Sequence, residues 1–522
     1  MANKSLFAPA SASSPTIQPT TAINAAGAGA FSLADEAALA QLACTGTFSG
    51  TFYATAETTL SDLLERAKKV SPEFLAKLAV YSRTRGFMKD SSALLLAVLM
   101  TRNIELFKKN FGRVIDNGKM LRTFVQIVRS GQVGRKSFGT APKRMIRQWL
   151  EARTDRQLFE DSVGNDPSLV DVIKMVHPKP ASPEREAFYA WLINKPVKNM
   201  EALPKLVVEF EKFKKDPKGT RTVPGIPFQM LTALDLSTEE WTSVAKNMKW
   251  HALRMNLNTL ERHGVLKNEE MVAYIAGKLR SERDVKFAKV FPYQLFTAYL
   301  HIGSGVPQVI RDALGEAMEH ATTNVPRVKG KVFVGVDFSG SMTAAVTGNR
   351  GTATTAVTCN QVASLMAACL IRNSDDCTVY RFDEQATHVQ LNPQASVLAN
   401  AKLIGANGGG TDCGAMLRVL NAQKATGDVV FILSDTESWA NHYAGRSTNL
   451  NTEWNVFKRR NPNAKLVCID LAANTTSQVP VQKDILNVGG FGDSVFEVVN
   501  AFLEGDTAGE HWVNRIMEEV PL

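Results

Sequence analysis

The chain has 522 residues, 44% of them hydrophobic and 21% charged, so it is long enough to form two or more domains with buried cores. No uncharged apolar stretch approaches the roughly 20 residues that a membrane helix needs, and we therefore expect no membrane partner. Six cysteines are scattered without C-x-x-C spacing, which argues against a zinc site or a disulfide framework and favours the cytoplasm.

Charge is divided unevenly along the chain. The net charge is +9, but residues 331–522 contain 14 Lys and Arg against 19 Asp and Glu, a net charge of −5. Residues 1–330 therefore carry +14. Any surface that binds nucleic acid is expected in this first part, although lysine-rich helix surfaces without a partner would give the same excess.

The first predicted element is a disordered tail over residues 1–33. Its first 31 residues are rich in Ala, Ser, Thr and Pro. They lack the continuous apolar segment of a signal peptide or a membrane anchor.

The pattern over residues 34–325 is helical. Leu60, Leu63, Leu64 and Ala67 recur at helical spacing, and Ser71-Pro72 has the form of a helix start. Many helices with short connections favour stacked helix pairs, as in a HEAT-like all-α solenoid. No clean repeat period is visible, so the periodicity itself predicts only a large all-α domain.

Basic residues gather in one part of this helical region. A glycine-punctuated basic stretch is followed by a predicted helix with three cations, and then by the sequence His177-Pro178-Lys179-Pro180. A charged helix surface is more often simply solvated, and a lone histidine near a helix end is more often a cap or a packing residue. The candidate RNA-binding residues are Arg129, Arg135, Lys136, Lys143, Arg144, Arg147, His177 and Lys179.

From residue 326 to 522 strands and helices alternate, which predicts a doubly wound α/β domain. Buried strands are expected at Lys331–Val336 and Val429–Leu433, with further strands near Cys377–Phe382 and Lys465–Leu471. A helix is expected from about Thr358 to Ile371. Ligands of such sheets bind at the carboxyl ends of the strands.

Oxygen-bearing side chains follow two of these strands and one glycine-rich loop. They are Asp337, Ser339 and Ser341, then Thr411, and finally Asp435. Carboxylate and hydroxyl oxygens suit Mg²⁺ or another hard divalent cation. The simpler alternative is three unrelated turns, since Asp and Ser are common in turns. The agreement of three loops favours a metal site.

The order of these five residues resembles the metal-ion-dependent adhesion site of von Willebrand factor A-type domains. The resemblance implies that Ser339, Ser341 and Thr411 bind the cation directly and that Asp337 and Asp435 hold it through water. It also implies one free coordination position for a ligand oxygen.

Nearly all of the chain from residue 35 onward resembles the Ro autoantigen family, which joins a helical TROVE module to an A-type domain. The similar stretches include Thr45–Tyr53, the R-S-G-x-x-G-R pattern of residues 129–135, Ser168–Pro180, Gly409–Cys413 and Asp435–Trp439. Differences from the family pattern include Thr436, where Asn is usual.

The resemblance implies a ring of HEAT-like helical repeats closed by the A-type domain. It implies a monomeric, non-enzymatic protein that binds small noncoding Y-like RNAs and the single-stranded 3′ ends of misfolded RNAs, in partnership with an exoribonuclease. The rival interpretation is an adhesion-like scaffold that binds acidic groups of proteins through the metal. A metal-dependent nuclease is disfavoured, because nuclease sites usually gather carboxylates around paired metals.

Overall fold

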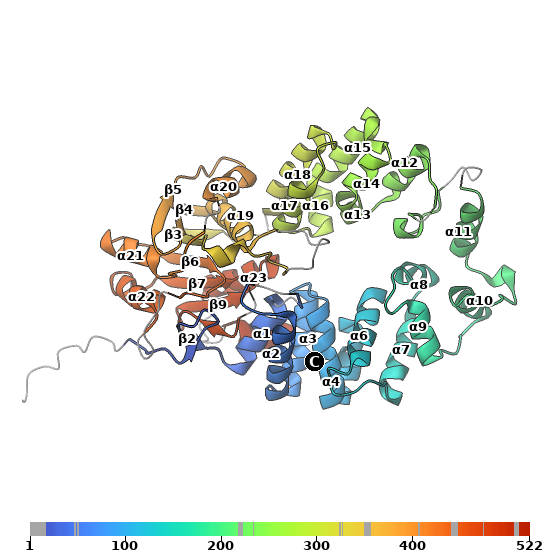
Figure 1. Ribbon diagram of the computed structural model, residues 1–522, viewed down its shortest axis with the longest axis horizontal. Coiled ribbons are helices and arrows are strands. Elements are labelled where there is room, and N and C mark those ends of the chain that lie inside the picture. The colour runs from blue at the N-terminus through green and yellow to red at the C-terminus, as the bar shows by residue number, and fades with distance from the viewer. Residues whose placement is uncertain are drawn as a thin grey trace, which may run out of the picture.

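The protein is a ring of helices attached to an α/β domain (Figure 1). The helices run away from the α/β domain along one side and return to it along the other (Figure 1). The computed structural model describes residues 17–45, 48–49, 52–217, 223–232, 234–322, 325, 327–348, 357–405, 408–439, 447–472, 474–505 and 511–522.

The helices of the ring alternate with short connections. The first half contains α1 (Asp35–Thr45), α2 (Ala56–Lys69), α3 (Pro72–Thr84), α4 (Asp90–Arg102), α5 (Ile104–Val114), α6 (Gly118–Ser130), α7 (Thr140–Ala152), α8 (Asp155–Asp161) and α9 (Leu169–Val176). The second half contains α10 (Pro183–Leu192), η1 (Met200–Ala202), α11 (Lys205–Lys215), η2 (Phe228–Met230), α12 (Thr238–Asn247), α13 (Trp250–Met255), α14 (Leu257–Arg262), η3 (Val265–Lys267), α15 (Glu269–Arg280), α16 (Glu282–Ala288), α17 (Pro292–His301) and α18 (Gln308–Ala321). The prediction of an all-α region is confirmed.

Capping residues in the sequence set where these helices begin. The Ser71 side chain accepts a hydrogen bond from the Phe74 N–H, and Pro72 occupies the first turn of α3. Ser237 and Glu240 form a reciprocal capping box at α12. Such caps satisfy N–H groups that have no partner within the helix. The predicted all-round apolar segment 93–100 is buried throughout, within α4.

The α/β domain is built on a six-stranded sheet with the order β5-β4-β3-β6-β7-β9. All neighbours are parallel except β4 and β5, so the predicted parallel sheet has an antiparallel edge. The strands are β3 (Val328–Asp337), β4 (Ser374–Phe382), β5 (Ala386–Val389), β6 (Val429–Ser434), β7 (Lys465–Asp470) and β9 (Ile485–Gly489). The helices are η5 (Gly340–Thr343), α19 (Cys359–Arg372), α20 (Val397–Ile404), α21 (Ala415–Ala422), α22 (Asn449–Arg460), α23 (Asp493–Glu504) and α24 (His511–Glu519).

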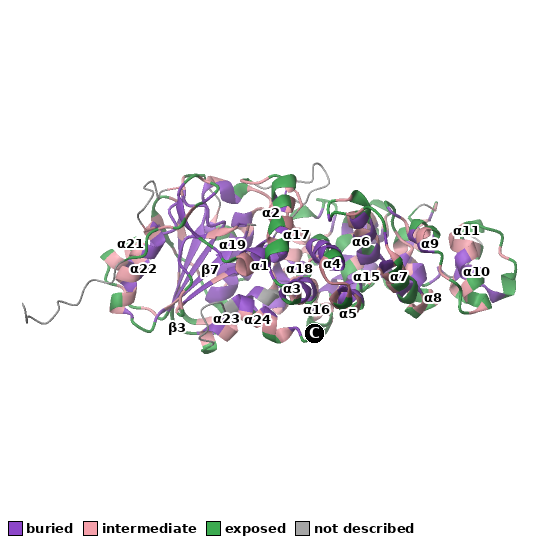
Figure 2. Ribbon diagram, turned by 90° about the horizontal axis from the view of Figure 1, so that it is seen from below, coloured by how far each residue is buried: buried purple, intermediate pink, exposed green. Residues whose placement is uncertain are grey.

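Alternate side chains of the central strands enter two different cores. Val334 and Phe431 belong to the cluster that includes α19 and α23, whereas Phe333 and Ile432 belong to a smaller cluster with α21 and α22. Because successive strand residues point to opposite faces, both faces must be covered. The buried strands lie between these helices in Figure 2.

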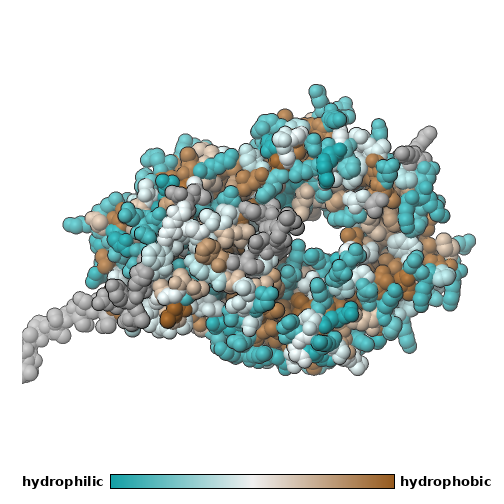
Figure 3. Space-filling view, viewed as in Figure 1, coloured by the Kyte–Doolittle hydropathy of each residue, from teal (hydrophilic) through white to brown (hydrophobic). Residues whose placement is uncertain are grey.

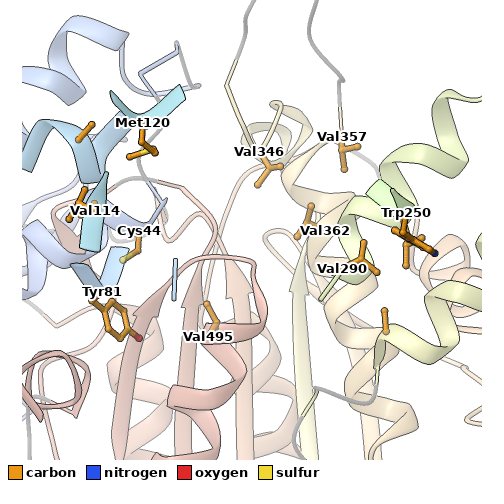
Figure 4. Packing of buried hydrophobic residues seen from close by; sticks show 14 of the residues in the cluster. Cys44, Tyr81, Val114, Met120, Trp250, Val290, Val346, Val357, Val362 and Val495 are labelled. Carbon is orange, nitrogen blue, oxygen red and sulfur yellow. The ribbon is translucent and has the colours of Figure 1, made fainter. Parts of the chain in front are cut away.

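The larger core continues from the sheet into both ends of the helical ring. In Figure 4, Cys44 and Tyr81 lie on one side of Val495, while Trp250 comes from α13 and Val290 from the connection between α16 and α17, on the returning side of the ring. The two ends of the ring are therefore joined through the apolar core of the α/β domain.

Polar contacts reinforce this closure. Helix α24 packs against α1 and α3, and the Lys77 ammonium donates to the Met517 carbonyl over 2.6 Å. The Gln41 amide of α1 donates to the Asp470 carboxylate at the end of β7 over 2.5 Å. The start of the helical ring is thus fixed to the last helix and to the sheet.

The predicted disordered tail is wrong for residues 22–32. Strands β1 (Ala22–Ile23) and β2 (Gly29–Ser32) form a small antiparallel sheet with β8 (Thr476–Ser477). Ala30 and Phe31 are buried there. Composition failed because the stabilising partner, β8, lies more than 400 residues away in the sequence. Residues 1–16 lie outside the described part of the chain.

Two other expectations concerned disulfide bonds and membrane helices. All six cysteines are free thiols. Among the described residues, no helix combines the length and the apolar character that crossing a bilayer requires.

Candidate metal and RNA sites

The five residues predicted to bind a metal lie at the carboxyl edge of the sheet. Asp337 ends β3 and Asp435 follows β6, and these strands are direct neighbours. Ser339 and Ser341 lie in the turn after β3, with their hydroxyl oxygens 3.3 Å apart. This edge is where a parallel sheet is expected to hold a ligand.

The loop of Thr411 is held against the same turn. The Gly340 N–H donates to the Gly409 carbonyl over 3.1 Å, and the Ser438 hydroxyl donates to the Thr411 carbonyl over 3.0 Å. Thr411 is buried. The three loops therefore converge as the sequence predicted, while their binding of a metal remains a prediction.

The carboxyl groups of Asp337 and Asp435 at this edge are buried, and their environment disfavours the ionised form. Burial, followed by the neighbouring Asp435, raises the pKa of Asp337 from 3.8 to about 7. Burial likewise raises the pKa of Asp435. Asp337 accepts hydrogen bonds from the Ser339 N–H over 2.9 Å and from the Ser434 hydroxyl over 2.5 Å, which partly offset the loss of solvent.

Sequence reasoning missed two further acids beside this site. Glu437 and Asp470 are both buried, and burial raises the pKa of Glu437 to about 7 and that of Asp470 well above its usual range. Asp435 adds to the shift at Glu437. In the described part of the chain, no Lys or Arg forms an ion pair with Asp337, Asp435, Glu437 or Asp470. An excess of buried acidic groups without a positively charged partner favours a bound cation.

The types of donor at this edge restrict what such a cation would contact. Within the described ranges, no three His, Cys, Asp or Glu side chains are grouped as metal ligands. A cation here would therefore depend on hydroxyl as well as carboxylate oxygens. That donor set suits Mg²⁺.

Thr436, in the loop after β6, has an unusual backbone conformation that is held by hydrogen bonds. Its φ of 56° lies in the left-handed region, which is unfavourable for a β-branched residue. The Thr436 hydroxyl donates to Asp470 over 2.8 Å, and its N–H donates to the Ser434 hydroxyl over 2.9 Å. An asparagine would tolerate this φ more easily than a threonine, and these hydrogen bonds help to hold the Thr436 backbone in this conformation.

The predicted basic residues lie on or between α6, α7 and α9. Arg129 is near the end of α6, Arg135 and Lys136 are in the connection to α7, and Lys143, Arg144 and Arg147 are on α7. His177 is the C-cap of α9, with a φ of 48°, and Lys179 follows it. Of these eight residues, Arg135 and Lys143 are half-buried and the other six are exposed.

Helix α9 brings the separate predicted segments together. The Arg147 guanidinium donates to the Val176 carbonyl over 2.5 Å, directly beside His177. Arg129 lies near enough to Asp171 at the start of α9 to help lower the pKa of that carboxyl, after the hydrogen bonds from Ser168. We call the eight predicted residues together with Lys174 the α6–α9 cationic surface.

Lys174 was missed, although His177 and Lys179 follow it closely in the sequence. It is exposed on α9 and also contributes to the lowered pKa of Asp171. Within the described structure, no lysine or arginine of the α6–α9 cationic surface forms an ion pair. In contrast, Arg153 and Arg185 nearby pair with Asp161 and Asp155.

A cavity of about 680 Å³ at the closure of the ring was also missed. Its walls combine aromatic and basic side chains, including Phe87, Tyr293 and Phe491 together with Arg83 and Lys119. These residues come from helices and loops far apart in the sequence, and local patterns therefore could not identify the cavity.

Comparisons with known proteins agree with this architecture. Residues 331–503 match the model of the Ro60 vWA domain. The chain is 23% identical to the RNA-binding protein RO60 of Deinococcus radiodurans over 523 aligned positions, which cover 92% of this chain and 95% of that protein. The chain is thus similar to Ro proteins, through the α/β domain in the first comparison and over nearly its whole length in the second.

Further relatives show how far the likeness to Ro proteins extends. RNA-binding protein RO60 of Caenorhabditis elegans is 22% identical over 275 positions, covering 50% of this chain and 41% of that protein. The crystal structure of the Deinococcus radiodurans Ro protein superposes with a TM-score of 0.63 at 21% identity. It covers 91% of this chain and 100% of the crystallised chain, which shows that the Ro fold extends over both the ring and the α/β domain.

Proposed function

We propose that this Ro-type protein binds RNA through the α6–α9 cationic surface and does not itself catalyse a reaction. The observation that carries the proposal is that the lysines and arginines of this surface come from three helices and from the connections beside them, and form no ion pair in the described structure. Cations without an ion-pair partner attract phosphates, and counterions are released when the phosphates bind. The relatives named as RNA-binding proteins support the same assignment.

The finer part of the proposal concerns the kind of RNA. We infer that structured, Y-like RNAs bind on the α6–α9 cationic surface and that single-stranded 3′ ends of misfolded RNAs enter the ring. The space-filling view shows an open hole through the ring (Figure 3). The aromatic and basic walls of the 680 Å³ cavity at the ring closure suit base stacking and phosphate contact. In this proposal the protein is a monomer and acts in RNA quality control in the cytoplasm. An exoribonuclease would associate with it through the bound RNA.

We further propose that Asp337, Ser339, Ser341, Thr411 and Asp435 hold one divalent cation, Mg²⁺. The buried carboxylates without a cationic partner support this assignment. Within the site, the hydrogen bonds from Ser339 and Ser434 orient the Asp337 carboxylate. When bound, the cation would neutralise these acids. We assign it no part in cutting RNA, because hydroxyls outnumber carboxylates among its proposed ligands.

The RNA proposal is tested by comparing a variant that lacks positive charge on the α6–α9 cationic surface with a control that lacks the same charge elsewhere on the ring. Lys143, Arg144 and Arg147 are changed together to Gln in the full chain. The control changes Lys205, Lys214 and Lys286 to Gln, which removes the same charge from surface lysines that are paired with Glu209, Glu211 and Glu282. Affinity for a structured RNA and for a single-stranded RNA is measured over a range of salt concentrations.

The cationic-surface variant should bind RNA more weakly and with a flatter dependence of log affinity on log salt. Each lost phosphate contact changes that slope by about 0.7 for single strands and about 0.9 for duplexes, so three lost contacts change it by about 2 and about 3, respectively. The control variant should retain most of its affinity. Equal losses in both variants, or a loss in the control alone, would show that RNA binds elsewhere.

A further inference from the structure

Two segments of the chain outside the α/β domain cover its candidate metal site. The first is the N-terminal segment around β1, where the Asn24 amide donates to the Ser438 carbonyl over 2.8 Å. In the same segment the Ala26 N–H donates to the Glu437 carboxylate over 3.2 Å. The site is therefore covered by the protein's own backbone on one side.

The second segment lies between α1 and α2 and contributes Tyr53. The Tyr53 hydroxyl is within hydrogen-bonding reach of the Ser341 side chain, which in turn hydrogen-bonds Asp435. Asp435, Glu437 and Asp337 all lie close enough to act electrostatically on the phenol. A side chain from the start of the helical ring thus places an oxygen beside the predicted metal ligands.

The space around this oxygen is small. A cavity of about 140 Å³ separates the two covering segments from the sheet edge, and Tyr53, Ser341, Asp435 and Glu437 are among its lining residues. It has room for several water molecules. The remaining wall comes from the N-terminal segment, from the end of α1, from α2, from the segment after η5, from the start of α19 and from the loop after β7.

We propose that Tyr53 is the protein's own ligand for the coordination position that adhesion sites leave open to a partner. This inference rests on the proposed metal site. The Tyr53 hydroxyl, like those of Ser339, Ser341 and Thr411, supplies a neutral oxygen to the cation. The cation then ties the first helices of the ring to the edge of the sheet, and the position is closed to acidic groups of other proteins. The adhesion-like scaffold function is accordingly disfavoured.

The test counts the water molecules on a bound Mn²⁺ ion by water-proton relaxation in the full-length protein. Tyr53→Phe removes the hydroxyl oxygen and keeps the aromatic side chain, so one more water molecule should bind the ion. The relaxivity should then rise by about the contribution of one bound water molecule. Acetate should lower that relaxivity in Tyr53→Phe and leave the wild type unchanged. Tyr274→Phe is the matched control, since this exposed tyrosine donates to the distant Lys246 carbonyl on the ring.

Two results would overturn this inference in distinguishable ways. If Tyr53→Phe and Tyr274→Phe give the same relaxivity, Tyr53 is not a ligand, although the metal site stands. If Asp435→Asn leaves Mn²⁺ affinity at the wild-type value, or the wild type binds no Mn²⁺, the metal site fails and the role of Tyr53 fails with it.

Discussion

Changing Asp337 to Asn should stabilise the metal-free protein at high pH. Asp337 is fully buried, and its pKa rises from 3.8 to about 7, first through burial and then through Asp435. The folded state therefore binds more protons than the unfolded state between these two pH values. Stability must fall as the pH rises from about 4 to about 7, and it stays low above pH 7.

The size of the effect follows from the shift in pKa. A shift of this size corresponds to about 4 kcal/mol of lost stability at pH 8 and about 2 kcal/mol at pH 5. Asn removes this loss but has only one oxygen for the two donors, the Ser339 N–H and the Ser434 hydroxyl. A lost hydrogen bond costs about 1 kcal/mol. The net gain should be about 3 kcal/mol at pH 8 and about 1 kcal/mol at pH 5.

The assay is denaturant unfolding with a chelator, followed through the transition that responds to Mg²⁺ in the wild type. Asp376→Asn is the control, because it removes the same charge from an exposed position on β4. Mg²⁺ at 1,000 times its Kd should reverse the order, since it stabilises the wild type by about 4.1 kcal/mol and the variant, which lacks the Asp337 charge, by much less. A variant that is equally destabilised at both pH values without metal would refute the electrostatic reasoning.

Two further predictions concern the same edge of the sheet. Asp337→Ala and Thr411→Ala should each abolish Mg²⁺ binding in calorimetry while the helical circular dichroism stays unchanged, because both residues lie outside the helical ring; unchanged affinity in both variants would contradict the site. The protein with Mg²⁺ should leave structured and single-stranded RNAs intact on gels, and RNA cleavage that disappears in Asp435→Ala would contradict a non-enzymatic role.

The sequence predicted the strands of the sheet and the convergence of the metal-site loops because these depend on local patterns. A buried strand such as 331–336 is recognised from a short apolar run, and the ends of parallel strands necessarily share one edge. The positions of Asp337 and Asp435 therefore follow from the order of residues along two strands. Family resemblance supplied the ring closed by an A-type domain, which periodicity alone did not reveal.

The missed features all depend on contacts between distant segments. Tyr53 and Glu437 join the candidate site only after the ring and the N-terminal segment have packed on the sheet. Lys174 becomes part of the α6–α9 cationic surface only because α9 packs against α6 and α7. Residues 22–32 form strands only where β8 supplies backbone partners. No local pattern in these segments encodes such partners.

The way in which the ring closes has a consequence for synthesis on the ribosome. Helix α1 emerges long before β7, β9 and α24, yet it packs against β9 and α24, and Gln41 of α1 bonds Asp470 of β7. While the chain is still growing, the apolar face of the first helices has no permanent cover. Exposed apolar surface of this kind promotes aggregation and recruits chaperones. Nascent chains that stop before β9 should therefore be bound by chaperones, whereas chains that include α24 can close the ring and escape.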